Sequence, residues 1–502
     1  MAEAGTLVGL RGLPGSRNLQ ITPYVLGADA GGSAVPAQEL GTTWDGGVDV
    51  KYGLTPRLTL DATWRTDFSQ VESDQEQVNL TRFSLFFPEK RAFFVENSGT
   101  YQFGDLAERD YRLGAGPRDF TLFHSRRIGL SDGRPVPIVA GGRLTGRVAG
   151  LELGVLNMQT ERTEALGAEN FTAARVRRTL FGAADVGGIL VNRQTTDGGT
   201  GYNRSWGVDA NMQLLGNLIV HSYLAETLEP GVRSDNRAAR ISAAWRGPLW
   251  DTSILYKRIG GSFDPGVGFV RRKDMRQTYA TVGIHPRPAI PGTTEINPYV
   301  EVDYITDLGS LLETRRLTGG LGVPFLDGGQ LDVRGTDRFE RLDEAFTVSG
   351  QVVPTGTHAF REYELSYNAS AARSLSGRVR VSGGGYFQGD RRSVGGNLVW
   401  RPSPHLALDV GADHNVLDLE GDPFTADVFS ARVDYLASTK LQIGAWVQYN
   451  DAAEEVVSNV KLNFIHAPLS DLFVVYTERR STRLDTALDR RFTIKLTKLL
   501  AF

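Results

Sequence analysis

The chain lacks cysteine, long apolar runs and any excess of charge of one sign. Its 502 residues include 55 Lys and Arg against 58 Asp and Glu, for a formal net charge of −3. Without cysteine, disulfide scaffolds, thiolate metal sites and cysteine nucleophiles are excluded. Balanced, interspersed charge gives no basic stripe for phosphate contacts, so we expect no nucleic-acid partner. No stretch approaches the ~18 consecutive apolar residues that a membrane-spanning helix needs.

What is present is a strict alternation of apolar and polar side chains. Residues 46–65 form a predicted hairpin in which Val48 and Val50 share one face, while Asp49 and Lys51 lie on the other. A period of two residues indicates β-strands with one apolar and one polar face. The same period returns in three further stretches, 239–256, 406–413 and 441–450. Glycine is also abundant, with 58 residues, as tight turns and close strand packing require.

The alternating stretches favour a membrane barrel over a soluble β-sandwich, which alternates as well. They run for about 9 to 14 residues, the length of a tilted strand that crosses a bilayer, whereas strands in soluble sheets have about five or six. Aromatic residues also lie near the ends of several apolar faces, as in the interfacial girdle of an outer-membrane barrel. They are Tyr52, Trp64, Trp245, Trp250, Trp400 and Tyr449.

The spacing of turns predicts the topology. Tight connections fall near Thr55, Ala149, Gly182, Gly216, Gly247, Pro288, Asp327, Arg373, Ser403, Ser438 and Pro468, and longer polar stretches lie between them. Short turns on one rim and long loops on the other are typical of outer-membrane barrels. With terminal strands at 19–28 and 491–502, we predict an all-β, antiparallel transmembrane barrel of about 24 strands, within a range of 22–26.

The end of the chain carries a signal of its own. Phe492, Ile494 and Leu496 alternate on one face, and the chain stops at Phe502. A terminal aromatic residue on an alternating strand resembles the signal by which the barrel-assembly machinery recognises outer-membrane barrels. We therefore expect this machinery as a partner, through the C-terminal strand, with Phe502 as the insertion signal.

One segment, 67–135, does not alternate. Loops longer than about 12–15 residues are usually functional or disordered, and this one is too aromatic for disorder. Its phenylalanine side chains need burial, while its charged side chains need hydrogen bonds or ion pairs. We therefore predict that the segment folds into the polar lumen of the barrel as a plug or constriction. An extracellular cap over the mouth is the alternative. The expected plug residues are Phe86, Phe87, Glu89, Lys90, Arg91, Phe93, Phe94 and Glu96.

Four strings resemble a bacterial family of uncharacterised outer-membrane β-barrel domains. They are DFSQVESDQEQVNL (67–80), FFPEKRAFFVEN (86–97), HSRRIG (124–129) and PIVAGGRLTGR (137–147), with FFPEKR the most specific. The resemblance implies a barrel that usually follows a module similar to family 9 carbohydrate-binding domains. Ala92 stands where this family's pattern leads us to expect proline.

The sequence contains few patterns that are typical of catalytic or metal-binding sites. The seven histidines are scattered without the spacing of a metal-binding pair, and no Gly-x-Ser-x-Gly motif is present. Asp413-His414-Asn415 near the outer rim is the one candidate dyad, and a polar strand end explains it equally well. Asp67, Glu72 and Asp74 are candidate cation contacts without the spacing of a calcium loop. We expect no enzyme activity, no cofactor and no bound metal.

Together these patterns predict a single barrel domain over 1–502, located in the bacterial outer membrane among lipid and lipopolysaccharide. The predicted function is a pore or gated transporter for a solute or polymer, occluded by 67–135. Charged side chains at the narrowest point would set its selectivity. The alternatives are a barrel scaffold that holds a surface or periplasmic partner protein and, more weakly, an outer-membrane hydrolase that acts through His414.

Overall fold

The computed structural model describes residues 18–35, 40–66, 77–107, 119–131, 134–163, 166–181, 184–419 and 422–502. Nearly all regular structure in these ranges is β-strand. None of the helices within them is long and apolar enough to cross a membrane.

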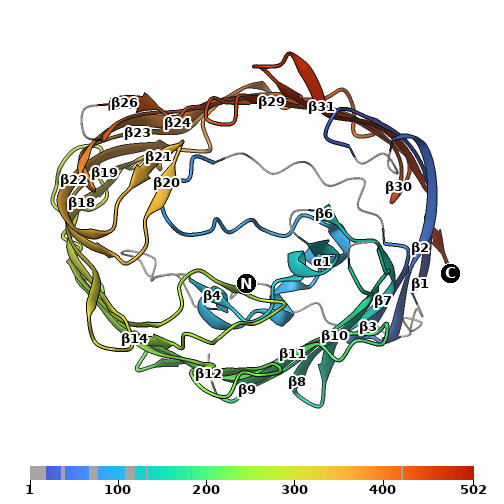
Figure 1. Cartoon of the computed structure of the whole chain (residues 1–502), viewed down its shortest axis with the longest axis horizontal. Coiled ribbons are helices and arrows are strands. Elements are labelled where there is room, and N and C mark those ends of the chain that lie inside the picture. The colour runs from blue at the N-terminus through green and yellow to red at the C-terminus, as the bar shows by residue number, and fades with distance from the viewer. Residues whose placement is uncertain are drawn as a thin grey trace.

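The strands form one closed antiparallel barrel, seen end-on in Figure 1. The main sheet has 26 strands, of which β26 and β32 continue β27 and β31 along their neighbours, so the ring itself has 24. The ring strands are β1 (Leu19–Gly31), β2 (Gly41–Thr55), β3 (Leu58–Trp64), β7 (Ile138–Val148), β8 (Leu151–Thr160), β9 (Glu169–Thr179), β10 (Asp185–Thr195), β11 (Tyr202–Leu214), β12 (Leu218–Leu228), β13 (Arg237–Arg246), β14 (Trp250–Ile259), β16 (Met275–Ile284), β17 (Asn297–Thr306), β18 (Leu312–Pro324), β19 (Gln330–Leu342), β22 (Gly356–Ala369), β23 (Leu375–Tyr386), β24 (Gly389–Ser403), β25 (Leu406–Leu419), β27 (Val428–Leu436), β28 (Leu441–Asn450), β29 (Glu455–Ala467), β30 (Ser470–Ser481) and β31 (Thr486–Thr497).

The remaining elements are short. They are β4 (Phe120–Thr121), β5 (Leu130–Ser131), β6 (Arg134–Pro135), β15 (Phe269–Val270), β20 (Phe346–Val348), β21 (Gln351–Val353), β26 (Asp422–Thr425), β32 (Leu500–Ala501), the α-helix α1 (Ala92–Val95) and the 3-10 helices η2 (Ser98–Tyr101), η3 (Gly104–Ala107) and η4 (Ser125–Arg127).

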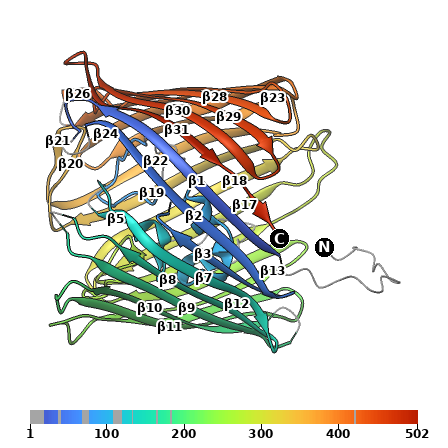
Figure 2. The same ribbon diagram turned by 90° about the vertical axis from the view of Figure 1, so that its right-hand side faces the viewer.

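The first and last strands close the ring. β1 pairs antiparallel with β31, and Val25 lies opposite Leu496. At the end of the chain Phe502 N donates to Leu19 O at 2.9 Å. Figure 2 shows the strands tilted across the barrel wall. The prediction of an all-β antiparallel barrel of about 24 strands is confirmed.

The two faces of the wall have opposite character. Ile241 of β13 and Ile254 of β14 are 58% and 57% exposed on the outside. Arg240 and Lys257 on the same two strands point inward and are 3% and 0% exposed. An exposed apolar band around a barrel with a polar interior is the arrangement that suits hydrocarbon outside the wall.

The two rims also differ. Connections at the predicted tight turns lie on the rim where Leu19 and Phe502 meet, which we call the turn rim; the opposite one is the loop rim. Two connections depart from the expected pattern. Residues 285–296 form a long turn-rim connection, which contains Pro286, Pro288 and Pro291. Proline has no backbone N–H to donate to a neighbouring strand, so this stretch does not continue β16 or β17. On the loop rim, β23 and β24 are joined by two residues only.

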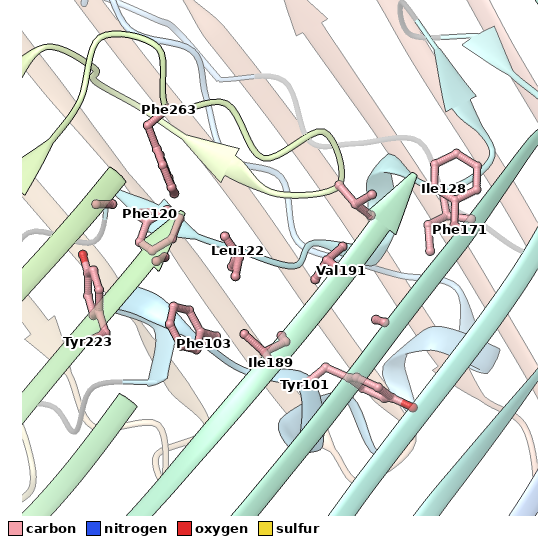
Figure 3. Close-up of a cluster of buried hydrophobic side chains, with 14 of the residues drawn as sticks. Tyr101, Phe103, Phe120, Leu122, Ile128, Phe171, Ile189, Val191, Tyr223 and Phe263 are labelled. Atoms are coloured by element: carbon pink, nitrogen blue, oxygen red, sulfur yellow. The ribbon is translucent and has the colours of Figure 1, made fainter. Parts of the chain in front are cut away.

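The described residues of the non-alternating segment lie inside the ring of strands, as Figure 1 shows for α1 and β4. We call residues 77–107 and 119–131 the lumenal segment. Its apolar side chains join a buried cluster with inward side chains of the wall (Figure 3). The cluster includes Phe94, Tyr101, Phe103, Phe120, Leu122 and Ile128 from the segment, and Leu156, Met158, Phe171, Ile189, Val191, Tyr223 and Ile259 from β8 to β14.

This cluster departs from the expectation of a uniformly polar lumen. The inner wall next to the phenylalanines is apolar because the segment, rather than water, covers it. A smaller buried cluster near β19, β23 and β25 contains Leu342, Tyr386 and Leu417, with Val78 and Leu80 of the segment packed against it.

Candidate functional site

The lumenal segment spans the barrel interior as a strap over residues 77–90. At its start, Tyr386 Oη of β23 donates to Leu80 O at 2.8 Å. Arg82 Nη2 lies 3.8 Å from Glu340 Oε2 of β19. Because these contacts lie on β19 and β23, whereas α1 and β4 lie near β7 to β14, the strap joins distant parts of the wall (Figure 1).

Phe83 is held within the strap by cations. The guanidinium carbons of Arg82, Arg271 and Arg272 lie 5.0, 5.3 and 5.5 Å from the centre of its ring. Cations over an aromatic face are attracted by the negative charge of that face. Burial and the neighbouring charge of Arg272 lower the pKa of Arg82 from its usual value.

The FFPEKR string folds back on itself around one ion pair. Arg91 Nη2 lies 2.7 Å from Glu89 Oε2, and Arg91 Nη1 donates to Ile128 O at 2.6 Å. Ser125 Oγ donates to Glu89 Oε2 at 2.8 Å. Burial alone would raise the pKa of Glu89, but Arg91 and Ser125 lower it overall, so Glu89 stays ionised. This pair therefore ties the string to η4 within the segment, not to the barrel wall.

The predicted phenylalanines take different positions. Phe86 stacks near His124, with ring centres 4.7 Å apart, and Phe87 lies under Arg126. Phe93 packs edge-on against Phe94 at 5.2 Å, and Phe94 is 5% exposed. The apolar members of the string therefore pack within the segment, and Phe94 also joins the buried cluster that the segment shares with the wall.

A second attachment joins α1 to the wall. Arg143 of β7 is 2% exposed and donates to Asp61 Oδ2 of β3 through Nη2 at 2.8 Å. Its Nη1 donates to the carbonyls of Phe93 and Glu96, at the C-terminal end of α1. Glu96 also pairs with Lys51 of β2 and keeps a half-exposed side chain. Among the predicted charged residues, Glu96 is thus one that reaches the wall.

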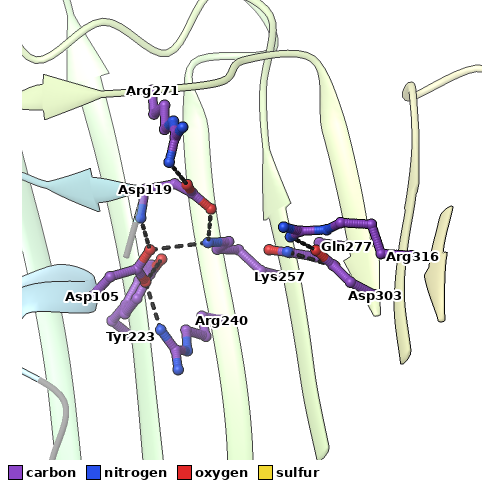
Figure 4. Close-up of polar contacts among 9 residues, drawn as sticks. All are labelled: Asp105, Asp119, Tyr223, Arg240, Lys257, Arg271, Gln277, Asp303 and Arg316. Carbon is purple, nitrogen blue, oxygen red and sulfur yellow. Dashed lines mark hydrogen bonds and ion pairs between the residues drawn. The ribbon is translucent and has the colours of Figure 1, made fainter. Parts of the chain in front are cut away.

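The third attachment is a buried charge network, shown in Figure 4. Asp105 of η3 is 0% exposed and accepts from Arg240 Nη1 at 2.7 Å, Lys257 Nζ at 2.9 Å and Tyr223 Oη at 3.0 Å. Lys257 Nζ also lies 3.1 Å from Asp119 Oδ2. Burial would raise the pKa of Asp105, yet Lys257 and Arg240 outweigh it and lower this pKa to about 2. Asp105 therefore stays ionised and couples η3 to β12, β13 and β14.

An adjacent contact depends on a glycine in the barrel wall. Phe103 is 0% exposed and lies over Gly207 of β11. A Cβ atom at position 207 would come within 2.3 Å of Phe103 Cζ. Glycine at this inward position makes room for the ring.

His124 lies where the strap meets the body of the segment. Burial lowers its pKa to about 4, against the opposing effect of Glu89. It is therefore neutral at neutral pH. Arg126 and Arg127 act in the same direction as burial.

The other predicted site residues have these positions. The backbone N–H of Lys90 donates to Glu89 Oε1 at 3.0 Å. Phe502 has a 74% exposed side chain at the turn rim. His414 faces outward on β25, and its Nδ1 lies 2.9 Å from Asp427 Oδ2. The candidate cation contacts Asp67, Glu72 and Asp74 lie outside the described residues. Within the described ranges, no group of three His, Cys, Asp or Glu side chains is placed to hold a metal ion.

Sequence reasoning predicted Glu96 of the second attachment but missed its partners Arg143 and Asp61, and it missed the residues of the third attachment. The alternation places Asp61 and Arg240 only on the polar faces of their strands. One signal was available: Ile189-Leu190-Val191 breaks the alternation, so both faces of β10 are apolar. An inward apolar face predicts that something covers it.

Comparison with protein families gives one match. Residues 16–181 match the family described as a domain of unknown function, DUF5916. The match spans about a third of the chain and includes the FFPEKR string and the lumenal segment, so over this stretch the chain is similar to an uncharacterised family. The expected association with a carbohydrate-binding module stays a prediction. No curated protein was found to match.

Solved structures from Pseudomonas aeruginosa are similar at low sequence identity. The ferric enterobactin receptor PfeA in complex with enterobactin has a TM-score of 0.44 at 9% identity, over 97% of this chain and 82% of that one. The siderophore receptor PirA has 0.44 at 10% identity, over 97% and 81%. OpdL has 0.31 at 10% identity, over 97% and 99%. None of these likenesses carries a function over to this chain.

Proposed function

We propose that this protein is an outer-membrane pore or gated transporter for a solute or polymer, in which the lumenal segment closes the passage. The observation that carries the proposal is the attachment of the segment to separated parts of the inner wall. Asp105 contacts β12 to β14, Arg143 of β7 holds α1, and the strap contacts β19 and β23.

The outer face supports the membrane location. Its exposed apolar side chains would contact lipid, with lipopolysaccharide around the loop rim. The short turns would then face the periplasm, where barrels of this class place them.

The attachments suit a gate that opens. All three use charged groups, and a buried ion pair adds little net stability because desolvation offsets its attraction. Removing one partner, however, leaves an uncompensated charge, which keeps the docked position specific. Glu89, Lys90, Arg91 and Glu96 would line or brace the narrowing. The half-exposed carboxylate of Glu96 is the group best placed to meet a passing solute.

Conductance in planar bilayers tests the proposal. Deletion of 67–135 is expected to raise the single-channel conductance several-fold, because the strap and its attachments are then gone. A reversible test uses a disulfide between the segment and the wall, formed in the double variant Asn97→Cys with Thr145→Cys. Asn97 Nδ2 lies 3.4 Å from Thr145 Oγ1, and the chain has no other cysteine.

The locked protein should open less often than the reduced one, and a reductant should restore its openings. Each single cysteine variant is the matched control and should be insensitive to reductant. If neither the intact protein nor the deletion variant conducts ions, the pore proposal is wrong.

A further inference from the structure

A small hollow lies on the lumenal face of β27, β28 and β29, on the side of the barrel opposite β9 and β12 (Figure 1). Its volume is about 150 Å³. Gln442, Gly444 and Trp446 of β28 line it and occupy alternate positions of the strand. Val447, at the position in between, is 43% exposed on the outside. Because successive side chains of a strand point to opposite faces, these three positions face the lumen.

A glycine forms the floor of the hollow. In the strand pairing, Gly444 lies opposite Asp434 of β27 and Lys461 of β29. A Cβ atom at position 444 would lie 3.2 Å from Asp434 Oδ1, the one atom of the described residues within 4 Å apart from those of its chain neighbours. The hollow therefore exists because position 444 has no side chain.

The indole of Trp446 borders this floor. The other lumenal positions of β28 are Gln442, Gly444, Gln448 and Asn450, so Trp446 is the aromatic residue on a strand face that is otherwise polar or bare. It is half-buried and therefore keeps part of its surface open to the lumen. A flat aromatic face of this kind packs against the apolar face of a ring-shaped solute.

The polar groups around the hollow supply both donors and acceptors. Arg432 Nε lies 2.8 Å from Asp434 Oδ2, so this carboxylate already has a cationic partner. Lys461 Nζ lies 5.9 Å from the centre of the Phe473 ring. Gln442 is exposed, and its amide both donates and accepts hydrogen bonds. A hydroxyl group does both as well, so a solute rich in hydroxyl groups matches this set better than an ion or a wholly apolar molecule.

We propose that this hollow binds one pyranose ring of a saccharide. A C–H face of the ring packs on the Trp446 indole, and the hydroxyl groups meet Gln442, Asp434 and Lys461. The volume of about 150 Å³ has the size of a single ring. This inference rests on the proposed function, because a site on the lumenal wall serves a solute that enters the lumen.

Methyl β-D-glucopyranoside is the probe for this site. The full-length protein is kept in a detergent without a sugar headgroup, so that the detergent does not compete. In ligand-observed NMR we expect a dissociation constant on the order of 1 mM. Trp446→Ala removes the aromatic face and should weaken binding about tenfold. Gly444→Leu fills the floor of the hollow and should abolish binding.

Two controls separate this site from general affinity for hydroxyl groups or tryptophan. Sorbitol has the hydroxyl groups but no ring, and it should bind about tenfold more weakly than the glucoside. Trp400→Ala, on the outer face of β24 with a 48% exposed side chain in the wild type, should leave binding unchanged. Equal binding by wild type, Trp446→Ala and Gly444→Leu would overturn the proposal, as would no binding by the wild type at roughly 10 mM.

The outcome is distinct from that of the bilayer experiment, because binding is measured at equilibrium and needs no current. Ion conduction without binding of the glucoside would overturn the saccharide site and leave the pore proposal standing. Binding that is lost in Gly444→Leu, without conduction by the intact protein or the deletion variant, would overturn the pore proposal and leave the saccharide site standing.

Discussion

At the scale of single residues, charge rather than apolar contact gives the lumenal segment its fixed position. An apolar cluster tolerates sliding, because the hydrophobic effect has no direction. Asp105, by contrast, accepts from three wall side chains at 2.7 to 3.0 Å, and each of these contacts has a defined geometry. Its lowered pKa keeps the carboxylate charged throughout the physiological range.

Asp105→Asn should therefore loosen the segment. The substitution removes one carboxylate partner from both Arg240 and Lys257, at a cost on the order of 3 kcal/mol. We expect trypsin to cleave the variant within the segment, at Arg82 or Arg126, at least tenfold faster than the wild type.

Asp303→Asn is the matched control for this experiment. Asp303 is also 0% exposed, but its partners Gln277 and Arg316 both belong to the wall (Figure 4). This variant should lower the thermal stability of the barrel without faster cleavage of the segment. Equal cleavage rates for the two variants would contradict the role assigned to Asp105.

His124 predicts a pH dependence of docking. A released histidine has a pKa near ~6.5, whereas burial lowers that of docked His124 to about 4. As the pH falls from about 6.5 to 4, the released state binds a proton that the docked state does not, so docking weakens, by up to ~3 kcal/mol. The pKa values of docked Asp105 and Glu89 are lowered, so a fall in pH acts on these carboxylates in the same direction and does not oppose the change.

Mobility of a spin label at Ser98→Cys measures this effect. The label should be immobile at pH 7.5 and increasingly mobile down to pH 4.5. With His124→Gln added, mobility should no longer depend on pH over this range. A profile that is unchanged in the double variant would assign the titration to another group.

At the scale of elements, a glycine on β11 decides how closely the segment approaches the wall. Gly207→Val would drive a side chain into Phe103, which is 0% exposed. Losing this packing should cost about 3 kcal/mol of docking free energy and speed tryptic cleavage of the segment. Gly188→Val on neighbouring β10 is the control, because a side chain at position 188 would point outward. The nearest atom to a Cβ at this position would be 3.7 Å away. That variant should be cleaved at the wild-type rate; faster cleavage would mean that strand glycines act through the barrel and not through Phe103.

At the scale of the whole molecule, the first and last ring strands meet at the closing seam between β1 and β31. The Phe502 side chain is exposed while its backbone pairs with Leu19, so the ring itself does not require the aromatic group. Phe502→Ser should reduce the amount of assembled barrel in cells several-fold and leave the thermal stability of purified barrel unchanged.

The fraction of protein that shows heat-modifiable migration in gels measures assembly. Phe464→Ser, an outward aromatic residue on β29, is the control and should assemble normally. If both variants assemble alike, the terminal position has no special role.

The alternation of side chains determined the strands, the turn rim and the size of the ring. A period of two is a local property, so each hairpin could be identified from its own residues. The tertiary structure alone decided where 67–135 lies against the wall. Asp105 meets Lys257 across 152 residues of sequence, and no local pattern links two such positions.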